Sequence, residues 1–307
     1  MELLISPKRL CLYNDSDRRV TAKFLNSVDN TLARASGQVV IDFSTVEYAG
    51  AAASVRLFAI ISRAYFMAFG TSSLRFIWPK KENNPYGHRY IVGTGLSIAL
   101  MANTVDKLDV LTKERRYFQS AVEPYEHWAK MMEFIDSKAI LTFEQYLLVS
   151  SALSEAMLNV SYHAYEHPDF AGATEHMQGK RWWQSCWYNP DTDKVVFIIY
   201  DLGLGIHKSF TSASPLFTGY DDVTSVSTAL TGGQSRYVNA GRGNGSEDIK
   251  RPIGSGCANS ESLLVFTGNV KYSYNSRNEV PKCEWIPEYM PGTLIEWSLV
   301  PRRGEDG

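Results

Sequence analysis

The sequence lacks the features that most directly assign a compartment or a chemistry. Its cysteines, Cys11, Cys186, Cys257 and Cys283, are far apart and form no Cys-x-x-Cys pair, which excludes a zinc knuckle and a thioredoxin-type motif. No apolar run has the length of a signal peptide or a membrane span. We therefore expect a reduced, cytoplasmic protein.

Charge of one sign is also not in excess. The net charge is -2 over 307 residues, which provides no electrostatic reason for a nucleic-acid or membrane partner. Hydrophobic residues make up 44% of the chain, enough to form packed cores in two domains of ordinary size. We find no internal repeat.

The N-terminal part has the pattern of a βαβ unit. Residues 39–43 (VVIDF) form a short apolar run suited to a buried strand, residues 51–66 are alanine-rich with helical spacing, and residues 74–78 favour a strand that Pro79 ends. Residues 104–140 are charged and favour helix. We therefore predict a first domain over 1–103, a helical connector over 104–140 and a second domain over 141–307.

The second domain should begin with a helix that runs from Thr142 to about Tyr165. Thr142 and Gln145 fit a capping box, and Pro168 prevents continuation. Next, residues 181–188 and 194–200 are expected to pair as a hairpin, and residues 263–266, 270–274 and 293–299 to form closing strands. Residues 207–245 are rich in Ser, Thr and Gly, so we expect a mobile loop.

Two side chains on the predicted helix could carry chemistry. Glu155 and Asn159 are four residues apart and share one face. The Asn159 carbonyl could join phosphate oxygens around Mg²⁺, and the Glu155 carboxylate could act as a general base. The alternative is an ordinary amphipathic helix with a solvated edge.

Two glycine-rich segments follow. Asp201 ends an apolar run and precedes Gly203 and Gly205, so its carboxylate could accept a hydrogen bond from an exocyclic amino group such as that of adenine. Gly241, Gly243 and Gly245 could present N–H groups to phosphate. A turn after a strand and a flexible surface loop are the alternatives. The chain has no P-loop, and the second cluster is not a dinucleotide fingerprint.

These segments, in this order, resemble the ATP-binding domain of the GHKL superfamily, which includes gyrase, histidine kinases and MutL. Residues 154–165 (SEAMLNVSYHAY) resemble its N-box, and residues 201–206 (DLGLGI) resemble its G1 box. Residues 241–245 resemble its G2 box, and Gly292-Thr293 resembles its G3 element. The anti-sigma-factor serine kinases are the most similar group, because the N-box and residues 215–218 (PLFT) match theirs.

The resemblance implies a Bergerat-type α/β sandwich that binds Mg-ATP. It implies that Glu155 is the general base, Asn159 the Mg²⁺ ligand and Asp201 the adenine reader. Gly203 and Gly205 would flank the base, the glycines at 241, 243 and 245 would cover the phosphates, and Thr293 would line the adenine pocket. Ser246, where the family has Leu, and the interruptions at Pro252, Gly254 and Gly256 depart from the pattern.

Residues 41–48 (IDFSTVEY) and the alanine-rich helix after them resemble a STAS domain of the anti-sigma-antagonist type. That family phosphorylates a serine at the start of the helix. The matching position is Ala52 and the nearest serine is Ser54, so we expect no phosphoswitch.

Two other groups favour structural roles. His163, His167 and His176 have no evident fourth zinc ligand, and Trp182, Trp183 and Trp187 favour hairpin packing over base stacking. The expected protein is an α/β (α+β) enzyme, either a GHKL-type ATPase or a serine/threonine protein kinase, with ATP and Mg as cofactors. A protein partner or substrate and a homodimer fit this reading, whereas nucleic acid and membrane do not. The alternative is a non-catalytic ATP-binding switch or scaffold.

Overall fold

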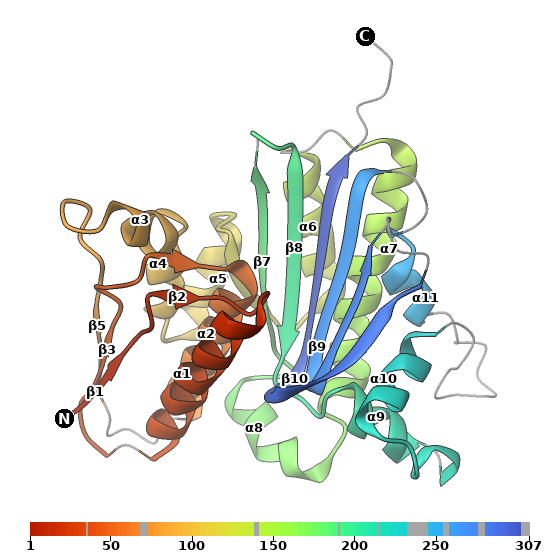
Figure 1. Cartoon of the computed structure of the whole chain (residues 1–307), viewed down its shortest axis with the longest axis horizontal. Helices are drawn as coiled ribbons and strands as arrows, with labels where there is room; N and C mark the ends of the chain where they lie inside the picture. The colour runs from red at the N-terminus through yellow and green to blue at the C-terminus, as the bar shows by residue number, and fades with distance from the viewer. Residues whose placement is uncertain are drawn as a thin grey trace. The chain divides into compact units, whose positions relative to one another are not determined.

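The computed structural model is a mixed α/β protein with several sheets (Figure 1). It describes residues 1–301 except 35, 68–72, 138–140, 190, 214, 232–244, 254–257 and 276–279. The chain divides into two compact units. The first comprises Met1–Ser120, Glu175–Gly179 and Trp183–Ser185, and the second Ala121–Thr174, Lys180–Trp182 and Cys186–Gly307. Among the described residues, no helix combines the length and the apolar character needed to cross a membrane.

The first unit contains a three-stranded parallel sheet in the order β1-β3-β5. Its strands are β1 (Glu2–Ile5), β3 (Val39–Asp42) and β5 (Leu74–Ile77), and a smaller parallel pair joins β2 (Arg9–Leu10) to β4 (Tyr48–Ala49). Helix α2 (Ala51–Met67) connects β3 to β5. The predicted βαβ unit is therefore confirmed.

The core of this unit lies around α2 and α1 (Asp15–Arg34). Residues 52–62 of α2 are all buried, which explains why an alanine-rich, largely uncharged sequence forms this helix. Phe24 of α1 contacts Phe43, whose ring stacks on Trp78 at 5.6 Å. Shorter helices follow: α3 (Pro85–His88), a π-helix (Arg89–Gly93), α4 (Leu96–Leu100) and α5 (Val105–Lys113).

The segment 104–140 contains more than helix. Between α5 and α6 (Pro124–Asp136) lies the strand β6 (Phe118–Ala121), whose first three residues are buried. This short strand could not be predicted from the sequence pattern, because charged residues precede it. Charged residues such as Glu114, Arg115 and Arg116 precede it and favour the helical interpretation.

The larger sheet has the strand order β6-β7-β8-β10-β9, and its strands β8, β9 and β10 belong to the second unit. The predicted hairpin is confirmed: β7 (Trp182–Asn189) and β8 (Lys194–Asp201) are neighbours. The three predicted closing strands form two long antiparallel strands, β9 (Ala258–Asn275) and β10 (Lys282–Pro301). Gly268, at a φ of +55°, lies within β9 where we expected a break. Trp182 and Trp183 are buried, as expected for hairpin packing.

Helix α7 (Phe143–Asn159) crosses the sheet beside α6 (Figure 1), and a π-helix (Val160–Ala164) continues it. The capping box is confirmed, because the Thr142 hydroxyl accepts the Gln145 N–H at 3.2 Å and the Gln145 side chain accepts the Thr142 N–H at 2.7 Å. A 3-10 turn (Pro168–Phe170) and α8 (Ala171–His176) follow.

The expectation of a mobile loop over 207–245 is wrong for its first half. The structure has α9 (Ile206–Ala213), a 3-10 turn (Pro215–Phe217) and α10 (Asp222–Leu230) there. The Asp221 side chain caps α10 by accepting the Thr224 N–H at 2.7 Å. Thr211 donates its hydroxyl to the His207 carbonyl, so the hydroxyls that suggested a loop are satisfied within a helix. Helix α11 (Gly245–Lys250) completes the fold.

Candidate functional site

Glu155 and Asn159 lie together on α7, as the four-residue spacing predicts. Glu155 is half-buried, and the Asn159 side chain forms a hydrogen bond with its carboxylate. Because a carboxylate only accepts, the Asn159 amide N–H must donate. Its carbonyl oxygen is therefore the atom left to bind a ligand. The π-helix begins at the next residue, and such widened turns occur frequently at functional sites.

Helix α11 adds a second carboxylate to this region. It packs against α7, and Trp297 of β10 donates its indole N–H to the Ile249 carbonyl at 2.8 Å. Burial raises the pKa of Glu155, the negative charge of Asp248 raises it further, and the hydrogen bond from Asn159 opposes both. Asp248 itself lies 3.1 Å from Arg251. Asp248 could not be predicted as a neighbour of Glu155, because the two residues are about ninety positions apart and a single sequence carries no signal for such a contact.

Asp201 is the last residue of β8 and is only 5% exposed. Burial raises the pKa of its carboxyl group to about 7, against hydrogen bonds from the backbone of Gly203 and Thr293 that lower it. The Gly203 N–H lies 2.8 Å from its Oδ1. A buried carboxylate with backbone donors on one side retains lone pairs that can accept a donor from a ligand.

The turn after β8 requires glycine at two positions. A Cβ at Gly203 would lie 2.0 Å from the carbonyl oxygen of Ala164, the last residue of the π-helix. Gly205 has a φ of +78°. The Leu204 N–H donates to the same Ala164 oxygen at 2.7 Å. The turn is thus held directly against the end of the helix that carries Asn159.

Gly292 and Thr293 come to the same place from the far end of the chain. Thr293 is paired with Asp201 across the β8–β10 ladder. Gly292 has a φ of +70°, and a Cβ there would lie 2.0 Å from the Asp201 carbonyl oxygen. Four segments that are remote in sequence, around Asn159, Asp201, Thr293 and α11, therefore form one region.

Two hydroxyl groups that the sequence pattern does not single out stabilise this region. The Tyr165 hydroxyl donates to the Arg181 carbonyl at 2.6 Å and accepts the Leu202 N–H at 3.1 Å. The Thr267 hydroxyl donates to the Gly292 carbonyl and accepts the Ile206 N–H, both at 2.9 Å. Tyr165 is the last residue of the segment that resembles the N-box, but the pattern around it is helical. Thr267 lies in an ordinary strand sequence. Neither residue can therefore be recognised from the sequence as part of the site.

The second glycine cluster is mostly beyond the described part of the chain. Gly241 and Gly243 lie outside the described residues, and Gly245 is the first residue of α11. No group of three His, Cys, Asp or Glu residues that could hold a metal ion occurs among the described residues. His163 instead lies 3.4 Å from Glu166 and His167 3.3 Å from Asp169, which agrees with the structural reading of the histidines.

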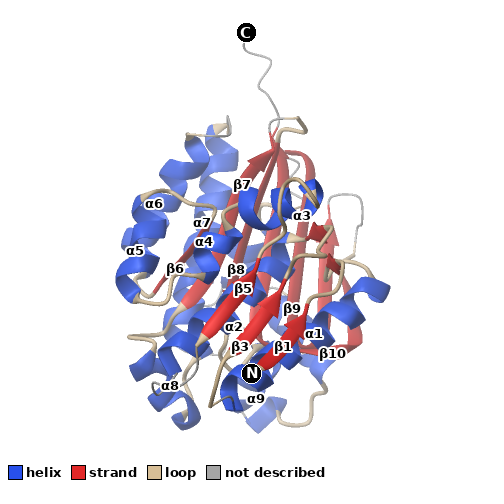
Figure 2. Cartoon of the chain, turned by 90° about the vertical axis from the view of Figure 1, so that its left-hand side faces the viewer, coloured by secondary structure: helices blue, strands red, loops and turns tan. Residues whose placement is uncertain are grey.

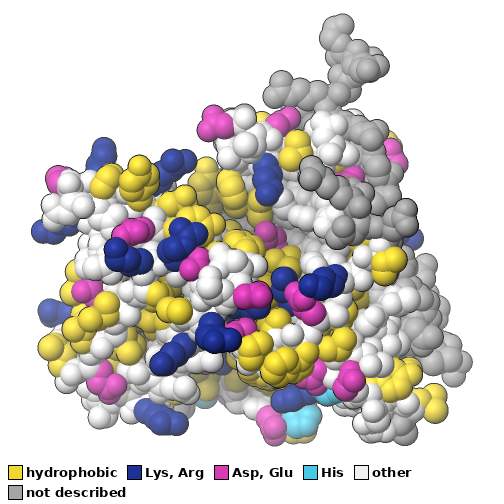
Figure 3. Space-filling model, in the orientation of Figure 1, with side chains coloured by type: hydrophobic (Ala, Val, Ile, Leu, Met, Phe, Trp, Pro, Cys, Tyr) yellow, Lys and Arg dark blue, Asp and Glu magenta, His cyan; other side chains and the backbone are white. Residues whose placement is uncertain are grey.

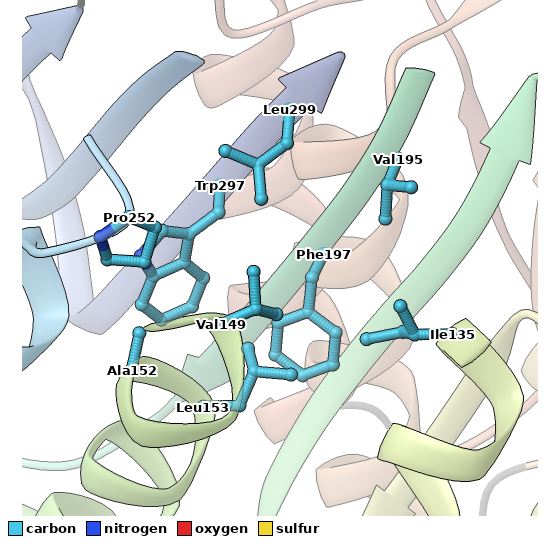
Figure 4. Close-up of a pocket in the computed structure, with 9 residues that line it drawn as sticks. All are labelled: Ile135, Val149, Ala152, Leu153, Val195, Phe197, Pro252, Trp297 and Leu299. Atoms are coloured by element: carbon cyan, nitrogen blue, oxygen red, sulfur yellow. The ribbon is translucent and has the colours of Figure 1, made fainter. Parts of the chain in front are cut away.

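A hollow between α6, α7 and the sheet is not part of this region. Its lining is apolar and none of the predicted site residues contributes to it (Figure 4). The space is about 10 Å³, which is room for at most one water molecule. It is therefore a gap in the core packing. The lining residues are Ile135, Val149, Ala152, Leu153, Val195, Phe197, Pro252, Trp297 and Leu299.

Replacing Gly203 by Ala should destabilise the fold, because the new methyl group must displace backbone. Overpacking of this kind typically costs about 1–3 kcal/mol. Gly219→Ala is the matched control, since nothing lies within 4 Å of the position of its Cβ. Urea unfolding of both variants measures the difference. Equal stabilities would show that the turn after β8 does not approach the π-helix this closely.

The sequence was compared with protein-family models and with curated proteins, and neither comparison found a match.

Proposed function

We propose that the second unit is a GHKL-type, Bergerat-fold ATP-binding sandwich that consumes Mg-ATP, by hydrolysis or by phosphoryl transfer to a protein partner. The observation that supports this most is the contact between the turn after β8 and the end of α7. It places the buried Asp201 carboxylate, the Asn159 amide and the Glu155 carboxylate on adjoining elements.

Asp201 supplies the recognition of the base in this proposal. Its ionised carboxylate accepts the exocyclic amino group of adenine, while Gly203 and Gly205 allow the backbone to pass close to the ring. The rigid turn supports this role, because the Gly203 N–H fixes one carboxylate oxygen at 2.8 Å. Thr293, paired with Asp201 on the next strand, lines the same pocket.

In this proposal Asn159 binds the metal ion, and Glu155 activates the nucleophile. Mg²⁺ is bound by few protein ligands and keeps several waters, so the Asn159 carbonyl together with the phosphates is a sufficient ligand set. When bound, Mg²⁺ neutralises charge that develops on the phosphates. Glu155 then orients and deprotonates the attacking water or hydroxyl.

The first unit is, in this proposal, a STAS-like module without the phosphorylated serine. Ala52 has no hydroxyl group, and Ser54 is 2% exposed and donates its hydroxyl to the Gly50 carbonyl at 3.0 Å. A kinase could not reach that hydroxyl without local unfolding. The unit would therefore contact its partner through its surface and not through phosphorylation.

Replacing Asn159 by Ala should weaken the binding of Mg-ATP far more than that of metal-free ATP. The reason is that the variant loses a metal ligand but no contact to the base or to the ribose. Calorimetric titrations with Mg²⁺ and with EDTA measure the two affinities, and the melting temperature without nucleotide reports any loss of fold. If both affinities fall by the same factor, Asn159 is structural and the metal site lies elsewhere.

A further inference from the structure

One face of the three-stranded sheet in the first unit is apolar and open. On β3, Val39 and Ile41 point to the side of the helices and are fully buried. On the opposite face, Leu3, Ile5 and Ile77 are 53%, 62% and 44% exposed. Figure 2 looks onto this sheet and shows its strands in front of α1 and α2. Figure 3, in the orientation of Figure 1, shows that hydrophobic side chains also occur among the charged ones on the surface that faces the viewer there.

The open face consists of the side chains of residues 3, 5, 40, 42, 75 and 77. Such an uncovered face is unusual for a parallel sheet. Purely parallel sheets are nearly always covered on both faces. Leu3, Ile5 and Ile77 lie together on this one face instead of being scattered singly over the surface, which favours an interaction site. The pattern is a property of the strands themselves, because the side chains at alternate positions of β1, β3 and β5 all contribute to it.

The two charges on the open face indicate what covers it. Strand pairing arranges the face in two rungs, Leu3-Val40-Arg75 and Ile5-Asp42-Ile77. The face therefore carries one cation and one anion, on different rungs and adjacent strands. Asp42 accepts the Ser44 N–H at 2.8 Å, and within the described residues Arg75 is exposed and in no ion pair. Such a face has no net charge and is complementary to itself.

We propose that the open face packs against the open face of a second copy of this chain. The two copies are related by a two-fold axis that lies between the two sheets and runs perpendicular to the strands. This axis exchanges the two rungs, so Arg75 of one copy lies over Ile77 of the other. Asp42 is then one strand away, about 4.8 Å to the side, and the sheets are about 10 Å apart. An arginine side chain spans that gap, so two symmetric Arg75–Asp42 pairs form between β5 of one copy and β3 of the other, beside the apolar side chains of β1.

The size of the face sets the strength of this dimer. Three strands of four residues cover roughly 14 Å by 13 Å, or about 200 Å² in projection. Stable interfaces bury about 800 Å² on each partner, so the open face alone supports weak, concentration-dependent association. The dimer does not depend on nucleotide, and its test is independent of the proposed function.

Sedimentation equilibrium of the full chain, without nucleotide and up to about 1 mM, should show a monomer–dimer equilibrium. Ile77→Lys and Arg75→Glu should each raise the dimer dissociation constant at least tenfold, because each introduces an unpaired or like charge. Val20→Lys is the matched control: Val20 is also 53% exposed, but on α1, and this change should have no effect.

A mixture of two charge-reversed variants tests the proposed Arg75–Asp42 pairing directly. Arg75→Glu and Asp42→Lys variants should each associate poorly, but an equimolar mixture should regain dimers, because both cross-pairs then join opposite charges. Melting temperatures of the single variants verify that they are folded. A wild type that stays monomeric throughout, a dimer unaffected by Ile77→Lys, or a mixture that does not recover would each overturn the proposal.

Discussion

Replacing Glu155 by Gln should reduce ATP turnover by about 10²–10⁴-fold, the usual contribution of a positioned general base. Gln keeps the volume and can still accept the amide of Asn159, so it removes the charge and basicity with little change in packing. Affinity for Mg-ATP should stay close to that of wild type, because Glu155 touches neither the base nor the metal. The variant should therefore accumulate a long-lived ATP complex.

Single-turnover consumption of labelled ATP measures this effect, with and without candidate protein partners. Glu144→Gln is the matched control, since Glu144 is an exposed carboxylate in the first turn of the same helix. A Glu155→Gln variant that turns over like wild type would show that another group activates the nucleophile. If wild type itself consumes no ATP above a no-protein blank, the protein is a nucleotide-dependent switch rather than an enzyme.

The sequence predicted correctly those parts of the structure that depend on residues close together in the chain. The capping box at Thr142 and Gln145 involves only the first turn of one helix, and the structure confirms both of its hydrogen bonds. The βαβ unit around α2 is equally local, since its strands and helix follow one another directly. The shared face of Glu155 and Asn159 likewise follows from helical geometry alone.

Long-range contacts could not be predicted in the same way. The approach of Gly203 to Ala164 and of Gly292 to Asp201 shows why those positions lack a Cβ, but a single sequence shows only that glycine is present. Asp248 affects Glu155 only because α11 packs on α7. The helices α9 and α10 were missed because Ser and Thr have weak helix propensity, which capping by Asp221 and tertiary packing override.

Replacing Asp201 by Asn should weaken ATP binding by about 10- to 150-fold, the equivalent of a lost charge-assisted hydrogen bond of ~1.5–3 kcal/mol. The amide replaces one acceptor oxygen by a donor that opposes the amino group of adenine.

The same substitution should not destabilise the folded protein. Because burial raises the pKa of Asp201 to about 7, the native state retains a proton that the unfolded state releases near pH 4. Stability from this group is therefore greatest below pH 4 and declines as pH rises towards 7. At pH 8, Asn removes a buried charge, so the melting temperature should not fall.

The same carboxyl group should make nucleotide affinity depend on pH in wild type. Adenine donates to the ionised form, so affinity should be constant above about pH 8 and weaken as pH falls through 7, approaching tenfold per pH unit below it. The phosphates of ATP titrate in this range as well, and Asp201→Asn controls for them, because it retains their contribution and loses that of the carboxyl group. Calorimetry of both proteins from pH 6 to 9 gives the difference between the two profiles. Parallel profiles, or an unchanged affinity in the variant at pH 8, would show that Asp201 stabilises the turn after β8 without reading the base. A wild-type profile that falls more steeply below pH 7 than that of Asp201→Asn would assign the recognition of adenine to the buried carboxylate of Asp201, whose pKa burial raises to about 7.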